Sequence, residues 1–519
     1  MKTFQKKFAL TVENHQKGFS LVELLVGVTI ALIATVAIFQ VFSVYETQKQ
    51  QTTSDSDALQ NGNLAYFLLS NELRQAGQGI STARLNAGKS MQLYGCRAQI
   101  WPFENRIPPL PTKDKHYLPL AENFDFQSGN NTFFGHRPPQ KNNNAGGDKD
   151  TWPVAPILIR TKANNKFTFP ENNGQNQDIL ITMRSTNTYN AIAPIAEIGS
   201  NGNKNFVKFG WFNGKEAKNW GNGNPQYLGF CSAGKTGTYC REAVMAISSD
   251  LKKCHITATD WEWKPEYSNG LLKGNLQLQT ATRNANPQQQ KPDPTTYKNG
   301  FLMNMGRLDR GNFSDKGTVG SGNDEKLKDD ILTRSGFAMF TAGRLAEAEN
   351  DQLGTTGNLL RYDLLHDKLE ALADNVVLLK AIYGVAPSEN SADPNNRNLA
   401  SNSVWHLPTG DWSYDKLRED TDAARNKIRR IRAIKVALVL RNSFPEIEDK
   451  KNAPAKPLPA LFKEELGNSA IQITIPANTD EATYHYEVVE FLIPLQNTQY
   501  GFDQAYASCM DNKDNKCSQ

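Results

Sequence analysis

An abrupt change from polar to apolar sequence near the N-terminus constrains this chain more than any other feature. Residues 1–18 are polar and basic, whereas from Phe19 to Val44 the only ionisable side chain is that of Glu23. This apolar run is longer than the ~20 residues that a helix needs to cross a bilayer core. Most charges before the run are lysines, so the positive-inside bias predicts a cytoplasmic N-terminus and export of everything after Val44. The sequence therefore predicts one membrane-spanning helix over residues 19–44.

Two ordinary kinds of N-terminal segment share part of this pattern. A secretory signal peptide has a shorter apolar run followed by a small-residue cleavage site, and no A-x-A site follows this run. A plain membrane anchor requires no particular residues at the polar-to-apolar junction. Here the junction is distinctive, because residues 17–23 read KGFSLVE.

This junction resembles the type IV prepilin signature. The resemblance implies that prepilin peptidase cuts between Gly18 and Phe19 and that Phe19 becomes an N-methylated first residue. It also implies that Glu23 pairs with the N-terminal amine of a neighbouring subunit during assembly. A carboxylate at the centre of a bilayer costs about 2.5–3.5 kcal/mol, so an unpaired one is unfavourable. Spacing alone would also allow an interfacial glutamate with no partner.

Helical periodicity continues beyond the apolar run and predicts one apolar stripe, because apolar or small residues recur at three- and four-residue steps. These residues are Leu59, Gly62, Ala65/Tyr66, Leu69, Leu73 and Ala76. Gly77 and Gly79 then supply a stop signal. We therefore expect a long pilin-like helix over residues 19–77. Its first half would lie in the membrane or fibre core, and its second half would pack on a globular head of residues 78–519.

The body after the helix is predicted to form an antiparallel sheet packed on that helix, which is an α+β fold. Its short β-branched or alternating runs are separated by turn-rich sequence. The runs are residues 156–159, 178–182, 275–278, 376–383, 434–440, 471–475 and 484–489. Asn- and Gly-rich stretches at 129–147 and 199–224 predict long loops.

Three of these segments extend the resemblance to the PilW family of minor pilins. Residues 372–385 end in Tyr-Gly-Val like a strand of that family, residues 432–441 resemble its later strand that closes on an arginine, and residues 484–497 resemble its final strand. Residues 96–330 match poorly, so we expect an insertion within that range. The resemblance implies a subunit that primes fibre growth at or near the tip, for twitching motility, adhesion or DNA uptake.

The same resemblance implies the partners and the location of the protein. The partners would be the major pilin, other minor pilins, prepilin peptidase and an inner-membrane assembly platform. The chain would cross the inner membrane once, with a periplasmic body, before it enters an extracellular fibre. Two alternatives stay open: a J-type pseudopilin of type II secretion, and a pilin-based adhesin whose inserted region binds a surface or receptor.

An even number of cysteines in an exported body predicts disulfides. The six are Cys96, Cys231, Cys240, Cys254, Cys509 and Cys517. Cys509 and Cys517 would close a short loop of the kind that pilins often carry, and Cys231 and Cys240 also bracket a loop. Cys96 and Cys254 then remain for each other, although the connectivity is open. A zinc site is disfavoured because the spacing lacks a paired C-x-x-C.

No motif in the chain predicts catalysis, a cofactor or a metal. Residues 229–236 match the phosphate-binding pattern G-x-x-x-x-G-K-[ST], but no strand leads in and no helix leads out, so we expect no nucleotide. H-E-x-x-H and G-x-S-x-G are absent from the sequence. The expected role is therefore structural rather than enzymatic.

Charge also gives little support for nucleic-acid binding, because the formal net charge is only +4. One basic cluster could touch DNA or an acidic partner. It consists of Arg425, Lys427, Arg429, Arg430, Arg432 and Lys435. We interpret it as a solvated strand edge whose charges discourage pairing with another strand.

Overall fold

The structure is a computed structural model of the whole chain, of which the following residues are described. The described residues are 20–78, 80, 83–84, 90–91, 94–100, 152–162, 177–184, 192–201, 204–209, 242–250, 252–258, 267–268, 271–272, 276–278, 297, 300–307, 336–343, 357–363, 368–386, 404–447 and 450–498. The chain divides into two compact units, Met1–Ser56 and Asp57–Gln519, which are described separately. Helix α1 (Leu21–Arg74) begins in the first unit and ends in the second.

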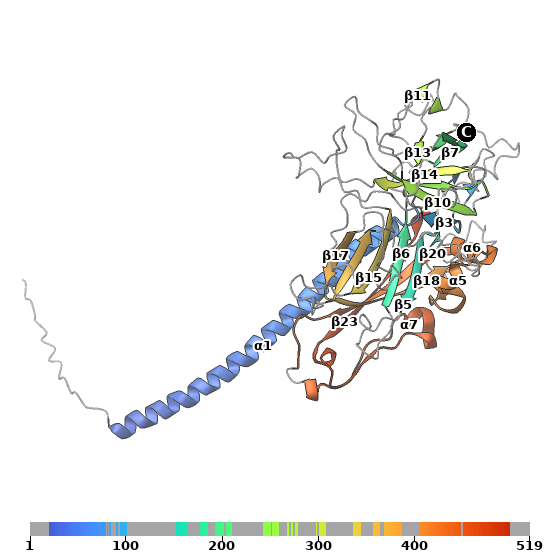
Figure 1. Cartoon of the computed structure of the whole chain (residues 1–519). Coiled ribbons are helices and arrows are strands. Elements are labelled where there is room, and N and C mark those ends of the chain that lie inside the picture. The colour runs from blue at the N-terminus through green and yellow to red at the C-terminus, as the bar shows by residue number, and fades with distance from the viewer. Residues whose placement is uncertain are drawn as a thin grey trace, which may run out of the picture. The chain divides into compact units, whose positions relative to one another are not determined.

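The second unit contains a four-stranded antiparallel sheet (Figure 1). Its order is β19 (Val404–His406), β18 (Val376–Val385), β20 (Ile431–Arg441) and β23 (Tyr486–Pro494). The two central strands are rich in β-branched and apolar residues, as strands buried on both faces are. The C-terminal half of α1 packs on one face, where the rings of Tyr66 and Phe491 lie 4.8 Å apart.

Short elements of residues 450–483 cover the opposite face, where Leu461, Phe462 and Ile475 join a core with Leu378 and Val439. These elements are η6 (Lys450–Asn452), β21 (Lys456–Pro457), α7 (Lys463–Leu466), η7 (Gly467–Ser469), β22 (Thr474–Ile475) and η8 (Glu481–Thr483). Beside the sheet lie η5 (Gly410–Trp412), α5 (Tyr414–Leu417) and α6 (Asp422–Arg429). The sheet is thus enclosed on both faces.

A second antiparallel sheet has five strands. Its order is β17 (Lys368–Asp374), β16 (Asn358–Asp363), β15 (Phe337–Gly343), β6 (Gln177–Met183) and β5 (Ile157–Lys162). Strands β17 and β18 are separated only by Asn375, which has a φ of 67°. This left-handed residue turns the chain from one sheet into the other, and its Nδ2 donates to Ser443 Oγ at 3.3 Å.

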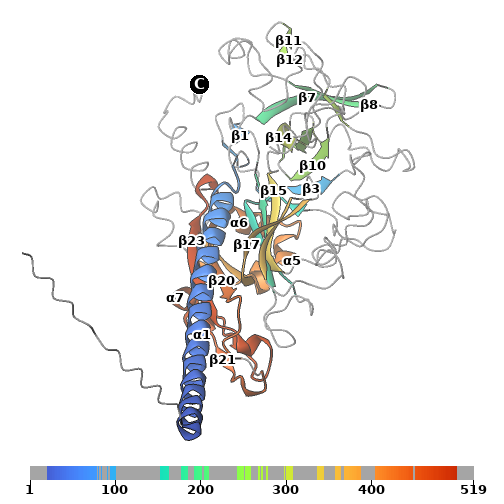
Figure 2. The same ribbon diagram turned by 90° about the vertical axis from the view of Figure 1, so that its left-hand side faces the viewer.

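A third sheet has eight strands, and its strands β7, β14 and β10 lie above the five-stranded sheet in both ribbon views (Figures 1 and 2). Its order is β13 (Leu276–Leu278), β8 (Lys204–Phe209), β7 (Ile192–Asn201), β14 (Phe301–Arg307), β9 (Glu242–Ile247), β10 (Lys253–Ala258), β3 (Arg97–Ile100) and β4 (Trp152–Pro153). Its neighbours pair antiparallel except β10 and β3, which are parallel. Two small hairpins are β1 (Ala83–Arg84) with β2 (Ser90–Met91), and β11 (Tyr267–Ser268) with β12 (Leu271–Leu272).

Two excursions of the chain supply this eight-stranded sheet. The first, residues 97–153, leaves and returns where Gly95 N–H donates to Val154 O at 2.7 Å and Val154 N–H to Cys96 O at 2.8 Å. The second, residues 185–335, leaves at the end of β6 and returns at the start of β15, where Arg184 N–H donates to Gly336 O at 2.6 Å. Each excursion therefore has a base closed by backbone hydrogen bonds.

The α+β fold predicted from the sequence is confirmed: a long apolar helix is followed by antiparallel sheets. Six of the predicted strands correspond to β5, β6, β13, β18, β20 and β23. The run at 471–475 is a strand only at Thr474–Ile475, with an isolated bridge at Ile471. The long loop predicted over 199–224 is wrong at its start, because β7 extends to Asn201 and Lys204–Phe209 is β8. The predicted loop at 129–147 lies outside the described residues.

Candidate processing and assembly site

The predicted cleavage and methylation residues, Gly18 and Phe19, lie outside the described residues. Glu23 lies in the first turn of α1 and is exposed. The Ser20 backbone N–H donates to Glu23 Oε2 at 3.3 Å, so the carboxylate caps an N–H group that the helix itself leaves unsatisfied. A negative charge is also favourable at this end of the helix dipole. Glu23 thus presents an anion on the helix surface directly after the predicted junction.

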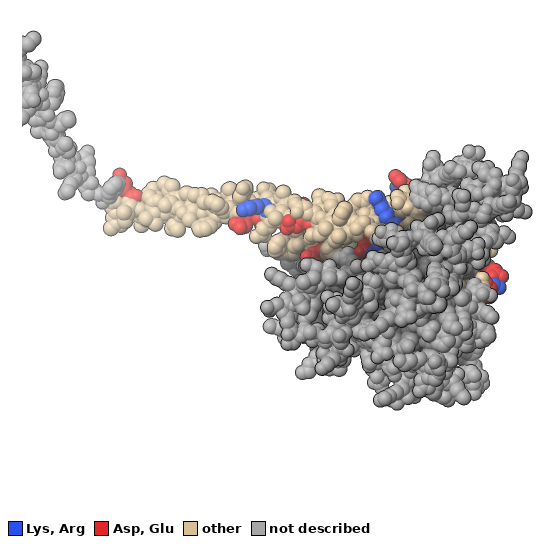
Figure 3. Space-filling model, turned by 90° about the horizontal axis from the view of Figure 1, so that it is seen from above, with Lys and Arg blue, Asp and Glu red and all other residues tan. Residues whose placement is uncertain are grey.

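The N-terminal half of α1 presents apolar side chains on all sides. Among the described residues, α1 is the one helix that is long and apolar enough to cross a membrane. Leu21, Leu32 and Phe39 are 60–78% exposed. The hydroxyls of Thr29 and Thr35 donate to helix carbonyls at 2.8 and 2.7 Å, so these polar groups are satisfied without water. Figure 3 shows a tan helix surface between the acidic patch at its start and the charged patches farther along.

The C-terminal half of α1 instead has a single buried stripe. Ala58, Ala65, Leu69 and Leu73 are fully buried. Leu59, which we predicted on this stripe, is 45% exposed, and Ala58 takes its place. The correction follows from the helical period, because position 58 lies closer than 59 to the face defined by Leu69 and Leu73.

Gly62 lets the helix approach the sheet closely. A Cβ built at this position would overlap Leu440 Cδ1 on β20. A larger residue would therefore have to displace either the leucine or the helix. Gly62 was predicted on the stripe, but its contact with one particular leucine was not.

The C-terminal end of α1 is held by residues from distant parts of the chain. Gly77 has a φ of 77°, and its N–H donates to Met183 O at 2.8 Å while its carbonyl accepts from Tyr94 Oη at 3.3 Å. Asn497 Nδ2 donates to the carbonyls of Arg74 at 3.1 Å and Ala76 at 3.3 Å. Carbonyls at a helix end have no partner within the helix, so these contacts supply the missing hydrogen bonds.

A buried ion network joins α1 to the five-stranded sheet. Glu72 lies 3.9 Å from Arg361 Nε and 3.5 Å from an Arg184 nitrogen. Arg361 is fully buried and also pairs with Asp363 at 3.3 Å and Glu370 at 3.8 Å. Sequence reasoning missed this network, although an arginine within the apolar run of β16 was an available signal. Such a buried network adds little net stability, because the cost of removing its charges from water offsets much of their attraction.

The structure contains a disulfide between Cys96 and Cys254, whose Cα atoms are 5.8 Å apart. Both side chains are fully buried. The predicted pairs Cys231–Cys240 and Cys509–Cys517 lie outside the described residues, and so does the phosphate-loop match at 229–236.

The interpretation of the basic cluster as a strand edge is wrong. Residues 425–429 belong to α6, and β20 is a central strand between β18 and β23. Its cations have partners in neighbouring segments, including Lys427, which lies 3.5 Å from the exposed Asp411. Arg425 forms ion pairs with Asp420 and Asp422, and Lys435 forms ion pairs with Glu465 and Glu490. The other three arginines donate hydrogen bonds to backbone carbonyls: Arg429 to Tyr94 O, Arg430 to Ala386 O, and Arg432 to Arg429 O. The cluster therefore ties α6 and β20 to their neighbours.

Among the described residues, no group of three or more His, Cys, Asp or Glu side chains is arranged to hold a metal ion. The charged side chains of α1, α6 and β20 act in helix capping, hydrogen bonding and ion pairing. Two features therefore characterise this region: Glu23 lies on the surface of an apolar helix, and hydrogen bonds from the body hold the other end of that helix.

Comparison with known families agrees with this picture. Residues 14–39 match the model of the prokaryotic N-terminal methylation motif, a prepilin-type signature. No curated protein and no solved structure matches the chain. The matched segment contains Gly18, Phe19 and Glu23 and extends into α1. The chain is thus type IV pilin-like, with a signature that implies processing by prepilin peptidase and assembly with other pilins. The signature and apolar helix fit anchoring in the inner membrane followed by incorporation into a pilus or a related secretion assembly, as a structural subunit.

Proposed function

We propose that this chain is a PilW-like minor pilin of a Gram-negative type IV pilus. It is made as an inner-membrane prepilin with its N-terminus in the cytoplasm and its body in the periplasm. Cleavage after Gly18 and methylation of Phe19 precede its entry into the fibre. With other minor pilins it primes fibre growth and resides at or near the tip.

The observation that carries this proposal is the prepilin signature at residues 14–39, continuous with an apolar helix surface. Exposed apolar side chains need a partner that excludes water, and a bilayer or a bundle of similar helices would provide one. The small residues of the buried stripe support the same role, because they fix the helix firmly on the head that it would carry.

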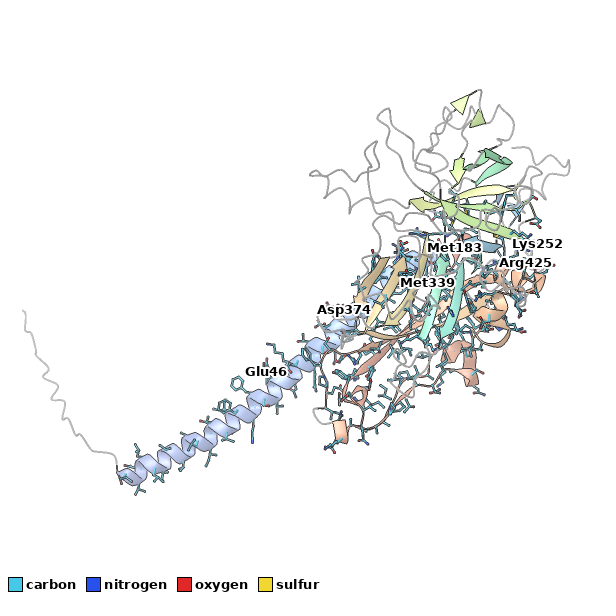
Figure 4. All side chains as sticks on the ribbon, in the orientation of Figure 1. Glu46, Met183, Lys252, Met339, Asp374 and Arg425 are labelled. Carbon is cyan, nitrogen blue, oxygen red and sulfur yellow. A yellow bond between two sulfur atoms is a disulfide. The ribbon has the colours of Figure 1, made fainter. Side chains whose placement is uncertain are left out.

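Glu23 gives the direct test of assembly. Glu23→Gln keeps the size and helix propensity of the side chain but removes the charge that would meet the N-terminal amine of a neighbour. We expect normal cleavage and loss of the subunit from sheared fibres, measured by immunoblot of fibre and membrane fractions. Glu46→Gln is the matched control, because Glu46 is an exposed carboxylate on the same helix (Figure 4). Equal incorporation of both variants would contradict the assembly role of Glu23.

A J-type pseudopilin of type II secretion would share the signature and the helix. Deletion of the gene separates the two functions. The minor pilin proposal predicts loss of surface pili with normal exoprotein secretion. Loss of secretion with normal pili would support the pseudopilin instead.

A pilin-based adhesin is a second candidate, and the two closed excursions favour it. They add an eight-stranded sheet without interrupting the hydrogen bonds at their bases. The test should spare residues 154–184, because β5 and β6 belong to the five-stranded sheet. Replacing residues 185–335 by Asn-Gly would reconnect β6 to β15 as a hairpin. Lost attachment with retained pili would support an adhesin, whereas lost pili would contradict it.

A further inference from the structure

The eight-stranded sheet is assembled from the two excursions, and a single parallel pair joins them. Strand β3 of the first excursion pairs with β10 of the second, from Lys253 with Arg97 to Ile256 with Ile100. This pair has only four positions in register, and parallel pairing is slightly weaker per residue than antiparallel pairing. The backbone junction between the two excursions is therefore short.

The Cys96–Cys254 disulfide lies at this junction. Cys254 is in β10, and Cys96 directly precedes β3 at the base of the first excursion. The bond connects positions separated by 158 residues. A cross-link over so long a segment removes much conformational freedom from the opened chain. It therefore reinforces the place where the pairing of the two excursions is shortest.

The base of the first excursion is also anchored to the head. Arg429 Nε donates to the carbonyl of Tyr94 at 3.2 Å, and Tyr94 Oη donates to Gly77 O. Gly95 has a φ of 91° and packs against Arg425 of α6, which Figure 4 labels. Cys96 thus extends from a segment held by α6 and by Gly77, which follows the end of α1.

The chain between the excursions belongs to the head rather than to the eight-stranded sheet. Gln177 Nε2 donates to Val377 O at 2.8 Å, and its Oε1 accepts from Leu379 N–H at 3.2 Å. Asp178 Oδ2 accepts from Ala381 N–H at 3.0 Å. These side chains satisfy β18 backbone groups along the stretch that β19 does not pair.

Asp178 strengthens this attachment from within the core. Its Oδ1 lies 3.2 Å from Lys380 Nζ and accepts from Thr161 Oγ1 at 2.6 Å. Burial raises the pKa of Asp178 above its ordinary value, against the opposing effects of Lys380 and the hydrogen bonds. Both side chains are nearly inaccessible, so removal of either partner would leave the other as a buried charge without its counter-charge. Strands β5 and β6 are thereby tied to β18.

We propose that the eight-stranded sheet is a module that opens as a unit separate from the head, and that the Cys96–Cys254 disulfide clamps it. In this proposal, the head is the part of the second unit outside the module, namely the C-terminal half of α1 with the four- and five-stranded sheets and the short elements that cover them. The module meets the head core through Met245, Ile247, Met303 and Met305. The clamp fixes β10 to a segment that the head already holds. This inference does not depend on whether the chain enters a pilus.

Hydrogen exchange on the full chain in detergent tests the clamp. In Cys96→Ala/Cys254→Ala, we expect amides of β9 and β10, such as Met245 and Ile256, to exchange faster by a factor of ~30 or more, the low end of what a disulfide contributes. Amides of β18 and β20, such as Leu379 and Leu438, should keep their wild-type rates. This contrast separates opening of the module from opening of the whole body.

Cys509→Ala/Cys517→Ala is the control, because it removes another predicted cysteine pair, one that would close only a short loop, and leaves Cys96 and Cys254 in place. It should leave the β9 and β10 rates unchanged. Unchanged module rates in the Cys96/Cys254 variant would show that the disulfide is not a clamp. Equal acceleration in the module and the head would show that they do not open separately. Either result overturns the proposal.

Discussion

The two halves of α1 are parts of one helix with different surroundings. In the first unit, apolar side chains are exposed around the helix, with Leu32 60% exposed and Phe39 69% exposed. In the second unit, Leu69 and Leu73 are fully buried against the sheets. The first half therefore needs an apolar environment from outside the chain, whereas the second half is buried against the chain's own sheets.

This difference shows how a single helix can serve two functions. An apolar surface that continues around the helix matches a bilayer or a set of neighbouring helices, whereas a narrow stripe matches one sheet. The ion network of Glu72 and the cap of Asn497 then fix the second half to the head. The first half of α1 is not part of this ion network, and the hydroxyls of Thr29 and Thr35 there donate to carbonyls of the helix itself.

Truncation of a leucine in each half should produce the largest contrast. Leu69→Ala removes a fully buried side chain and should lower the free energy of unfolding of the head by about 2–5 kcal/mol. Leu32→Ala should leave that free energy nearly unchanged, because Leu32 has no place in the head core. Denaturant unfolding of the full chain in detergent measures both. Similar losses would contradict the division of the helix.

The two glycines of α1 provide a smaller but closer comparison. A Cβ at Gly62 would overlap Leu440, whereas a Cβ at Gly27 would meet nothing within 4 Å. Gly62→Val should destabilise the head by about 1–3 kcal/mol through overpacking. Gly27→Val should not destabilise it. If Gly62→Val were neutral in the same unfolding assay, the close approach of helix and sheet would not be important.

The cap at the end of the second half should have the smallest effect. Asn497→Ala removes the side chain that donates to Arg74 O and Ala76 O, and should cost about 1 kcal/mol. Faster amide exchange should be confined to the last turns of α1, since exchange there depends on fraying of that end. Unchanged exchange rates in these turns would show that Asn497 does not stabilise the end of α1.

Local patterns in the sequence predicted the parts of this architecture that depend on local chemistry. The junction at Gly18 and Phe19, the long helix and the apolar strands such as β18 and β20 all carry a pattern within a short segment. The stripe was predicted through Leu69 and Leu73, but Leu59 was placed on it although the helical period puts Ala58 closer to that face.

Long-range pairing was beyond such reasoning. Asn497 caps a carbonyl 421 residues away, and no local pattern marks it as a cap. The range 96–330, in which an insertion was expected, contributes to two different sheets. Strands β5 and β6 belong to the five-stranded sheet, whereas the strands on either side of them in the sequence form the eight-stranded sheet. Lys380 within the apolar strand β18 is a signal that the sequence analysis did not use, and only the fold identifies its partner as Asp178.

The central claim is that the chain is processed as a prepilin before its apolar helix enters an assembly. N-terminal sequencing with mass analysis of the protein isolated from the membrane or fibre fraction tests this claim most directly. We expect a mature chain that begins at Phe19 and carries one N-methyl group on that residue. A mature chain that begins at any other residue, or that retains Gly18, would contradict it.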